Sequence, residues 1–278
     1  MEWYIVLPIA VLGAAILAAC IWLFLIGARS KKPIAHLLRF KYAHRGLHGK
    51  LDYDTEAPEN SLLAFRRAVE RGYGMELDVR LTKDFHAVVF HDDTLLRMCG
   101  ADKKVSDLTL AELKEYTLGD TEERIPTFRE VLDTVAGKAP IIIELKGESA
   151  DTAVSQKAIE VLSGYEGEYV FESFNPILVD AVRGLAPDKG RGFLVSKHTE
   201  NENFRSIKYR VIQRQLCNFL ARPHFIACEK NHLKLFPASL IPKLFGTALV
   251  AWTVKSREEE ERAMAEGFDC VIFEDYLA

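Results

Sequence analysis

Short apolar runs alternate with longer amphipathic stretches along most of this sequence. The short runs have the length of buried strands, and the longer stretches carry apolar residues at helical spacing. Strands are expected at Phe40–Ala43, Met75–Val79, Ala87–Phe90, Ile141–Leu145, Tyr169–Phe171, Gly192–Val195, Phe225–Cys228, Leu249–Thr253 and Cys270–Phe273. Helices are expected at Ser61–Arg71, Leu110–Tyr116, Thr127–Val135, Thr152–Ser163, Pro176–Leu185, Ile207–Leu220 and Ser256–Glu266. This alternation predicts an α/β fold built on a parallel sheet.

The chain after its amino terminus has about the length of a (β/α)8 barrel, which is roughly 250 residues. Such a barrel has eight strands, and the sequence predicts one strand more than that. The connection from Met75–Val79 to Ala87–Phe90 contains no helix, whereas a parallel crossover needs about a dozen residues or more. We therefore expect Ala87–Phe90 to fold back as a hairpin with its turn at 83–85. The return strand would bring His91 over the barrel mouth. The expected fold is a TIM (β/α)8 barrel with a short hairpin excursion after the second strand.

The amino terminus has a different pattern, because Trp3–Gly27 contains no Asp, Glu, Lys, Arg or His. As a helix this segment would be about 37 Å long, enough to cross a bilayer core of roughly 30 Å. A secretory signal is the alternative, and Leu17–Cys20 resembles a lipoprotein cleavage box. Such signals have an apolar core of about 7–15 residues after a basic stretch. Here the apolar run continues to Ile26, and the only charged side chain before it is that of Glu2. We therefore expect an uncleaved transmembrane helix.

Charge adds an orientation and a domain organisation to this picture. Arg29, Lys31, Lys32 and Arg39 follow the apolar segment, which predicts that the remaining chain is cytoplasmic. The expected organisation is an anchor in the bilayer at residues 1–30, a basic juxtamembrane link at 31–39 and a barrel at 40–278. The net charge of −4 gives no indication of nucleic-acid binding. The five scattered cysteines predict neither a disulfide framework nor a zinc site, and the oligomeric state cannot be read from the sequence.

Polar side chains gather at the carboxyl ends of the predicted strands, where TIM barrels build their active sites. Glu76 and Asp78 are two residues apart on one strand, so both side chains face the barrel interior. Two carboxylates there would repel each other and lose solvation, which a divalent cation such as calcium or magnesium would relieve. Glu144 can supply a third carboxylate from another strand. The alternative is a metal-free network of ion pairs between Glu76, Asp78, Arg45 and Lys146.

Two of the eight histidines end predicted strands beside the acidic cluster, namely His44 and His91. An imidazole titrates near neutral pH, so the pair could act as general acid and general base, or one could be a metal ligand. The other histidines are expected to be structural or exposed: His36, His48, His86, His198, His224 and His232. Trp252 is either a core residue or a wall of the substrate pocket. The segment Pro58–Ser61 mainly predicts a helix cap, with Asn60 or Ser61 as the capping residue.

Taken together, these segments resemble the glycerophosphodiester phosphodiesterase family. The resemblance covers nearly all of the predicted barrel and lies outside the amino-terminal segment. Each motif alone is weak, but their joint order and spacing are specific. The motifs are His44-Arg45-Gly46, Pro58-Glu59-Asn60-Ser61, Glu76-Leu77-Asp78-Val79, Leu81-Thr82-Lys83-Asp84, Val88-Val89-Phe90-His91-Asp92, Ile125-Pro126-Thr127-Phe128, Ile143-Glu144-Leu145-Lys146, Ser173-Phe174-Asn175 and Trp252-Thr253-Val254.

The resemblance implies a TIM barrel related to that of phosphatidylinositol-specific phospholipase C. It implies one divalent cation, calcium or magnesium, held by Glu76, Asp78 and Glu144. His44 and His91 match the family's acid–base pair, whereas Arg45 and Lys146 match positions that contact the phosphate. Glu59 and Trp252 are assigned to the substrate pocket. The family hydrolyses glycerophosphodiesters to glycerol 3-phosphate and an alcohol, and some relatives are lysophospholipases D.

Several positions depart from the family pattern without removing a catalytic group. Phe85 stands where glycine is usual in the hairpin turn, and Lys255 where asparagine is common. Phe273-Glu274 replaces a Thr-Asp pair, so that Glu274 keeps the charge, and Tyr276 replaces a proline. Two other functions stay open, namely a lysophospholipase D acting on membrane lipids and a catalytically silent phosphodiester-binding protein. The intact set of histidines, carboxylates and cations argues against the silent protein.

Overall fold

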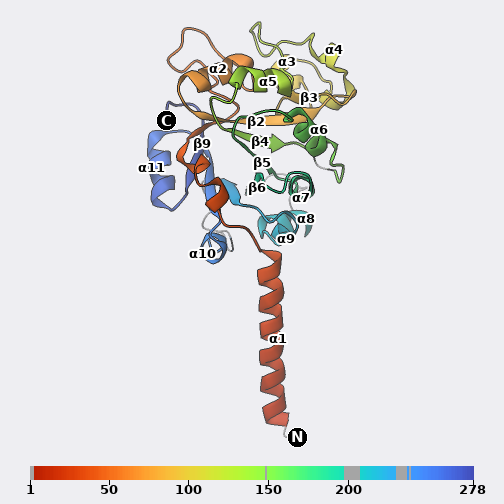
Figure 1. The fold of residues 1–278 in the computed structure, drawn as a ribbon, viewed down its shortest axis with the longest axis vertical. Helices are drawn as coiled ribbons and strands as arrows, with labels where there is room; N and C mark the ends of the chain where they lie inside the picture. The colour runs from red at the N-terminus through yellow and green to blue at the C-terminus, as the bar shows by residue number, and fades with distance from the viewer. Residues whose placement is uncertain (1–2, 148, 197–206, 230–236, 238) are drawn as a thin grey trace.

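The computed structural model describes residues 3–147, 149–196, 207–229, 237 and 239–278. Its centre is a closed barrel of eight parallel strands, with a ninth strand at the edge (Figure 1). The strands are β1 (Tyr42–Ala43), β2 (Gly74–Leu81), β3 (Ala87–Val89), β4 (Ile141–Leu145), β5 (Tyr169–Ser173), β6 (Gly190–Val195), β7 (Phe225–Glu229), β8 (Ala248–Val254) and β9 (Cys270–Phe273). β1 pairs with both β2 and β9, and this pairing closes the barrel. The predicted TIM barrel is confirmed.

Most helices pack on the outside of the barrel as predicted. They are α2 (Leu62–Glu70), α3 (Leu96–Cys99), α4 (Leu110–Leu113), α5 (Phe128–Val135), α6 (Ala153–Val161), α7 (Pro176–Leu185), α8 (Ile207–Gln213), α9 (Asn218–Ala221), α10 (Ile241–Phe245) and α11 (Arg257–Ala265). The single helix predicted over 207–220 is wrong, because the structure has α8 and α9 there, and Gln215 between them has a left-handed φ of 54°. The short helices α3 and α10 were not predicted.

The predicted hairpin is confirmed by the antiparallel pairing of β2 with β3. Leu81 lies opposite Ala87, and the turn at its end includes Phe85 with a φ of 61°. A left-handed φ favours glycine, so Phe85 holds a backbone conformation that glycine would adopt more readily. The hairpin carries the chain back along β2, so that the backbone N–H of Phe90 donates to the carbonyl of Asp78 at 2.9 Å. His91 therefore returns to the carboxyl end of β2.

The barrel interior changes character along its axis. Near the amino-terminal ends of the strands it holds a buried apolar cluster that includes Tyr42, Ile142, Val170 and Leu194. Toward the carboxyl ends the inward positions are acidic, since Asp78 pairs in register with Glu144. A second apolar cluster, on the outer faces of the strands, joins them to the helices. The apolar layers stabilise the barrel and leave the polar layer at its carboxyl rim.

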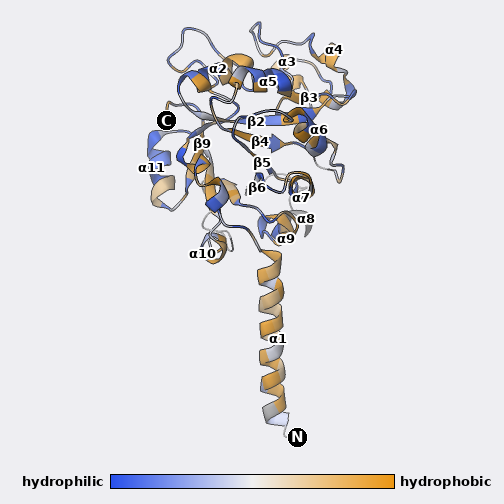
Figure 2. Cartoon of the chain, in the orientation of Figure 1, coloured by the Kyte–Doolittle hydropathy of each residue, from blue (hydrophilic) through white to orange (hydrophobic). Residues whose placement is uncertain are grey.

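The amino-terminal helix α1 (Trp3–Leu25) projects away from the barrel and is apolar along its length (Figures 1 and 2). Within it, Val6–Leu25 is long and apolar enough to cross a membrane, a test that a signal sequence also passes. Residues 32–39 then form two 3-10 turns that bury Ile34 and Leu37 under the barrel. The N–H of Lys31 donates to the carbonyl of Gly246, just before β8. The chain therefore enters the barrel on its amino-terminal face, opposite the acidic rim.

Candidate active site

The three carboxylates singled out in the sequence meet inside the barrel mouth. Glu76 and Asp78 come from β2 and Glu144 from β4, and one oxygen of each lies within 4.8 Å of the others. All three are buried, with exposed fractions of 2%, 1% and 7%. Parallel pairing of β2 with β4 places Asp78 directly beside Glu144. The geometry follows from the period-two alternation of strand side chains together with this register.

A fourth buried carboxylate, that of Glu172 on β5, was missed by the sequence analysis. The predicted strand ended at Phe171, but β5 continues to Ser173 and places Glu172 beside Glu144. Glu172 is 1% exposed, and its Oε2 has no hydrogen-bond partner among the described residues. Burial, together with the charge of Glu144, raises the pKa of Glu172 well above its usual value. Burial and the neighbouring acid therefore both disfavour the charged form of Glu172.

Two cations lie against the carboxylates. The Nζ of Lys146 is 2.8 Å from Asp78 Oδ1 and 2.7 Å from Glu144 Oε1. Arg45 donates its backbone N–H to Glu76 Oε2 at 3.0 Å, and its Nε is 3.6 Å from Asp78 Oδ2. The ion-pair network considered from the sequence is thus present in the structure. It does not balance the site, because four carboxyl groups face only two cations.

The pKa values of the carboxyl groups also indicate that the two cations do not neutralise all of the acids. Burial and the neighbouring acids raise the pKa of Glu76 well above its usual value, and burial raises the pKa of Glu144 to about 7. Burial also opposes the charge of Asp78, but Lys146, His91 and Arg45 outweigh it and hold that pKa well below its usual range. The buried Oε1 of Glu76 has no hydrogen-bond partner among the described residues. An oxygen-rich, electron-pair-rich site of this kind fits one hard divalent cation.

Asn60 contributes a further contact that the sequence analysis did not assign. Ser61 is the cap of α2, because its hydroxyl accepts from the N–H of Ala64 at 3.1 Å. Asn60 has a left-handed φ of 57° and turns inward, where its Nδ2 donates to Asp78 Oδ2 at 2.8 Å. The motif around Pro58 therefore does two things. It starts a helix, and it orients one carboxylate of the acidic cluster.

His44 is held by a carboxylate from the far end of the chain. Its Nδ1 is 2.6 Å from Glu274 Oε2, while its Nε2 lies 4.0 Å from Glu76 Oε2. Lys255 holds the other oxygen of Glu274 at 2.6 Å, and His48 Nε2 is 3.7 Å from Glu274 Oε2. Burial lowers the pKa of His44, an effect that the hydrogen bond to Glu274 partly opposes. His48 was expected to be structural or exposed, so its place beside Glu274 was missed.

His91, which follows β3, has a matching arrangement. Its Nδ1 is 2.6 Å from Asp92 Oδ1, and Arg97 Nε holds the second oxygen of Asp92 at 2.7 Å. Burial lowers the pKa of His91, and the charge of Asp78 opposes that effect. Each of the two histidines therefore makes a hydrogen bond from Nδ1 to a carboxylate that is itself held by a cation. We assign the proton to Nδ1 in both neutral rings, which leaves Nε2 free for chemistry.

The two residues assigned to the substrate pocket have different surroundings. Glu59 joins Arg45 to Arg97, with nitrogen–oxygen distances of 2.8 Å and 2.6 Å. Trp252 lies in the carboxyl-terminal half of β8 and packs edge-to-face on Phe174, with ring centroids 5.7 Å apart. The indole Nε1 of Trp252 is buried without a hydrogen-bond partner in the described part of the chain. Glu59 thus lies against a predicted phosphate-binding residue, whereas Trp252 has an unused donor.

The remaining described histidines lie away from the acidic cluster. His36 and His86 are exposed and pair with Glu168 and Asp84 at 3.3 Å and 3.4 Å. His224 is buried before β7, and burial lowers its pKa to about 4. His198 and His232 lie outside the described residues.

Comparisons with known proteins agree with this geometry. Residues 44–277 match the glycerophosphoryl diester phosphodiesterase family. A glycerophosphodiester phosphodiesterase of Caldanaerobacter subterraneus is 32% identical over 245 residues, which cover 84% of this chain and 93% of that protein. A solved phosphodiesterase of Oleispira antarctica, in complex with the product sn-glycerol-3-phosphate, is 26% identical with a TM-score of 0.71; the match covers 87% of this chain and 95% of that one. A lysophospholipase D of Rattus norvegicus is 34% identical over 141 residues, which are 46% of this chain and 42% of that protein.

Proposed function

The chain belongs to the glycerophosphoryl diester phosphodiesterase family, and we propose that it hydrolyses glycerophosphodiesters to glycerol 3-phosphate and an alcohol. One observation carries the proposal. A buried cluster of Glu76, Asp78 and Glu144 lies close to two histidines whose Nδ1 atoms are fixed by carboxylates. The product held by the Oleispira antarctica structure is the product proposed here. A site that only bound phosphodiesters would need neither oriented imidazole.

Glu76, Asp78 and Glu144 would hold one calcium or magnesium ion. When bound, such an ion polarises a non-bridging oxygen of the phosphodiester. The unpartnered oxygen of Glu76 and the excess of carboxyl groups over cations support this assignment. Asn60 orients Asp78, and Lys146 joins Asp78 to Glu144.

The other residues would bind the phosphate and move protons. Arg45 and Lys146 neutralise the charge that develops on the phosphoryl oxygens. One histidine takes the proton of the nucleophile through Nε2, and the other gives a proton to the leaving alkoxide. The nucleophile is either water or the 2-hydroxyl of the substrate, and His44 and His91 can take either role. Glu59 keeps Arg45 in place at the pocket wall, and Trp252 offers its indole N–H to the substrate.

A substrate panel tests the proposed activity. Purified full-length protein should release glycerol 3-phosphate from glycerophosphocholine, and exhaustive chelation should abolish turnover until calcium or magnesium is restored. Product analysis by mass spectrometry measures both results. Absence of turnover on every glycerophosphodiester, with metal present and the protein folded, would leave only the binding function.

Lysophospholipase D activity is the second candidate. The apolar helix α1 and the partial similarity to the rat lysophospholipase D favour it. The entry of the chain on the barrel face opposite the catalytic residues instead favours water-soluble substrates. Including lysophosphatidylcholine in the same panel separates the candidates, because a lysophospholipase D would convert it faster than glycerophosphocholine.

For the amino terminus we propose an uncleaved anchor at residues 1–30, a link at 31–39 and a catalytic barrel at 40–278 on the cytoplasmic side. The apolar length of α1 and the cations after it support this arrangement. The link is not a free tether, because Ile34 and Leu37 are buried under the barrel. The anchor would thus hold the barrel in a defined orientation relative to the bilayer.

Glu274→Gln is expected to lower kcat by at least about tenfold with little change in KM. The substitution removes the charge that fixes the Nδ1 proton of His44 and keeps the side-chain size, and second-layer changes of this kind have such effects. Glu274→Asp restores the charge and should recover part of kcat. Steady-state kinetics on glycerophosphocholine measures all three forms.

Asp275→Asn is the matched control for this prediction. Asp275 is the adjacent carboxylate and also contacts Lys255, at 3.2 Å, but it forms no hydrogen bond or ion pair with His44 in the described structure. Its kcat should stay near that of the wild type. Equal losses in Glu274→Gln and Asp275→Asn would mean that Lys255, and not the orientation of His44, is what matters.

A further inference from the structure

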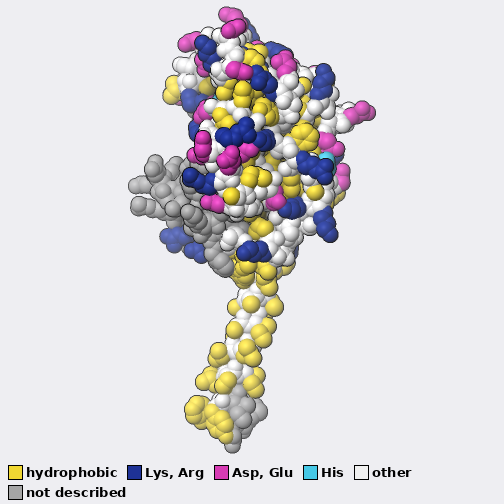
Figure 3. Space-filling model, turned by 90° about the vertical axis from the view of Figure 1, so that its left-hand side faces the viewer, with side chains coloured by type: hydrophobic (Ala, Val, Ile, Leu, Met, Phe, Trp, Pro, Cys, Tyr) yellow, Lys and Arg dark blue, Asp and Glu magenta, His cyan; other side chains and the backbone are white. Residues whose placement is uncertain are grey.

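Positive charge is concentrated where the barrel meets α1. Three segments contact or adjoin the end of that helix, namely 26–41, 207–222 and 239–246. Together they contain ten Lys and Arg residues and no Asp or Glu, in a chain whose 40 acidic residues outnumber its 36 basic ones. Figure 3 shows Lys and Arg side chains at the end of the domain from which the apolar helix leaves. The charge of the chain is therefore strongly asymmetric.

The three segments are joined to one another by specific contacts. Asn218 Nδ2 donates to the carbonyl of Ile26 at 3.3 Å, and the guanidinium of Arg222 lies 5.1 Å from the ring centroid of Phe24. The hydroxyl of Thr247, just after the third segment, donates to the carbonyl of Arg29. These contacts fix α9 and α10 beside the end of α1, where Figure 1 also places them.

Two of the ten cations are already neutralised, because Lys31 pairs with Asp269 and Lys41 with Glu260. Of the other eight, Arg39 lies in the second 3-10 turn and the side chain of Lys208 lies outside the described structure. The remaining six have no ion pair with a described carboxylate. We name this set the basic collar: Arg29, Lys32, Arg210, Arg214, Arg222 and Lys243. All but the half-buried Arg222 are exposed.

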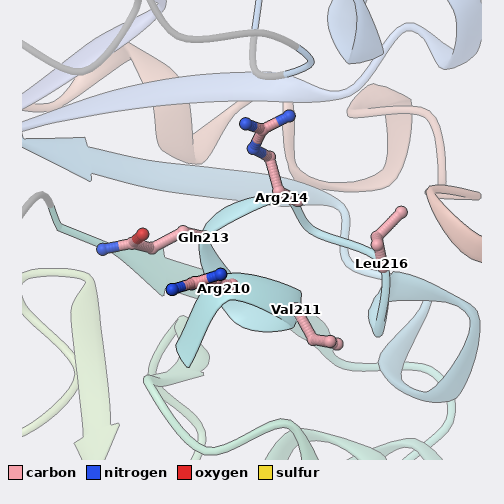
Figure 4. Close-up of a pocket in the computed structure, with 5 residues that line it drawn as sticks. All are labelled: Arg210, Val211, Gln213, Arg214 and Leu216. Atoms are coloured by element: carbon pink, nitrogen blue, oxygen red, sulfur yellow. The ribbon is translucent and has the colours of Figure 1, made fainter. Parts of the chain in front are cut away.

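The collar also contains a pocket and exposed apolar side chains. A pocket of about 570 Å³ is lined by Arg210, Val211, Gln213, Arg214 and Leu216. Figure 4 shows both guanidinium groups projecting from α8 and the turn that follows it. Val211 and Leu244 are 36% and 46% exposed beside these cations. Guanidinium groups bind phosphates well, and apolar side chains among cations are typical of surfaces that lie in a bilayer interface.

We propose that the basic collar docks on the headgroups of anionic phospholipids, with α8, α9 and α10 lying on the bilayer surface. The proposal rests on the membrane anchor proposed above, since α1 brings the collar to headgroup level. Anionic lipids attract each nearby Lys or Arg by about 1 kcal/mol. The collar would convert a single-helix tether into a fixed orientation of the barrel.

The test uses the full chain in lipid nanodiscs of phosphatidylcholine alone or with phosphatidylglycerol. A fluorophore on Leu244→Cys, with Cys20 and Cys99 replaced, reports contact with lipids that carry a nitroxide quencher on the headgroup. Quenching should be stronger with phosphatidylglycerol and should fall at high salt. The triple variant Arg210→Gln/Arg214→Gln/Lys243→Gln should lower the ratio of docked to undocked domains on the order of 100-fold.

The control is Lys50→Gln/Lys104→Gln/Lys138→Gln, which removes three exposed cations outside the collar segments. Docking should survive in this control, and both triple variants should keep normal turnover of glycerophosphocholine. Equal quenching in the two lipids, or equal losses in the two triple variants, would overturn the proposal. So would quenching that depends on the number of copies per disc, which would make the collar an interface between copies.

Separate measurements test the membrane anchor and the enzymatic function on which the docking proposal rests. Flotation with phosphatidylcholine vesicles at high salt tests α1 alone, because the collar contributes nothing under those conditions. A chain that fails to float would overturn both the anchor and the docking, whereas a chain that floats without lipid-dependent quenching would overturn only the docking. Turnover of glycerophosphocholine reports the enzymatic function separately from either result.

Discussion

His44→Ala and His91→Ala are each expected to lower kcat about 10²- to 10⁴-fold while the barrel still folds, because proton transfer by a positioned side chain contributes that much. Both rings lie at the carboxyl rim, and each has its Nδ1 fixed by a carboxylate and its Nε2 left for the substrate. Neither side chain belongs to the apolar clusters that stabilise the barrel. Steady-state kinetics together with thermal unfolding measures the two parts of the prediction.

His86→Ala is the control for these variants. His86 lies in the same hairpin as His91, but it is exposed and pairs with Asp84. The turnover of the His86→Ala variant should therefore be nearly normal. The double variant His44→Ala/His91→Ala should be much less than additively worse, since groups that act as a unit are not additive. Near-normal kcat in His91→Ala would contradict the proposed acid–base pair. Unfolding of both single variants would mean that the histidines are structural.

The central carboxylates and the hairpin could be predicted from the sequence because both follow from short-range rules. The spacing of Glu76 and Asp78 fixes their common face, and the short connection after β2 excludes a parallel crossover. Strand ends are harder to predict. The predicted end of β5 at Phe171 was short by two residues, and this error hid Glu172.

The partners of the histidines could not be found in this way. Glu274 is 230 residues from His44 and reaches it only because β9 closes the barrel against β1. The family resemblance implied that Glu274 keeps a usual charge, but it did not show which group that charge faces. Asn60 was missed for a different reason, because its place before a helix already had a sufficient local explanation as a cap.

Replacement of a proposed metal ligand is the second change with a large expected effect. Glu76→Gln and Glu144→Gln should each lower turnover on the order of a thousandfold, since a bound cation contributes several kcal/mol to the transition state. Glu172→Gln is the matched control, because Glu172 is a buried carboxyl group beside Glu144 but outside the three-ligand cluster. The turnover of Glu172→Gln should remain within a few-fold of the wild type, because the three proposed ligands are all retained.

The same variants should also differ in how their free energy of unfolding depends on pH. The pKa of Glu144 is raised to about 7, so without metal the folded chain binds protons more tightly than the unfolded chain. The free energy of unfolding of the metal-free protein should therefore fall as pH rises from the ordinary glutamate pKa toward about 7. Metal binding releases these protons, so the stabilisation by calcium or magnesium should grow over the same range and level off above it.

Thermal unfolding with and without the cation, across pH, measures this growth in the wild type. Glu144→Gln should lose the stabilisation by metal and the part of the pH-dependent decline that Glu144 contributes, because an amide neither titrates nor carries charge; the decline from Glu76 and Glu172, whose pKa values are also raised, should remain. Glu172→Gln should keep the stabilisation by metal. If the cation stabilised Glu144→Gln as much as the wild type, or if activity survived exhaustive chelation, the carboxylates would form only the ion-pair network with Arg45 and Lys146, and the metal assignment would be wrong.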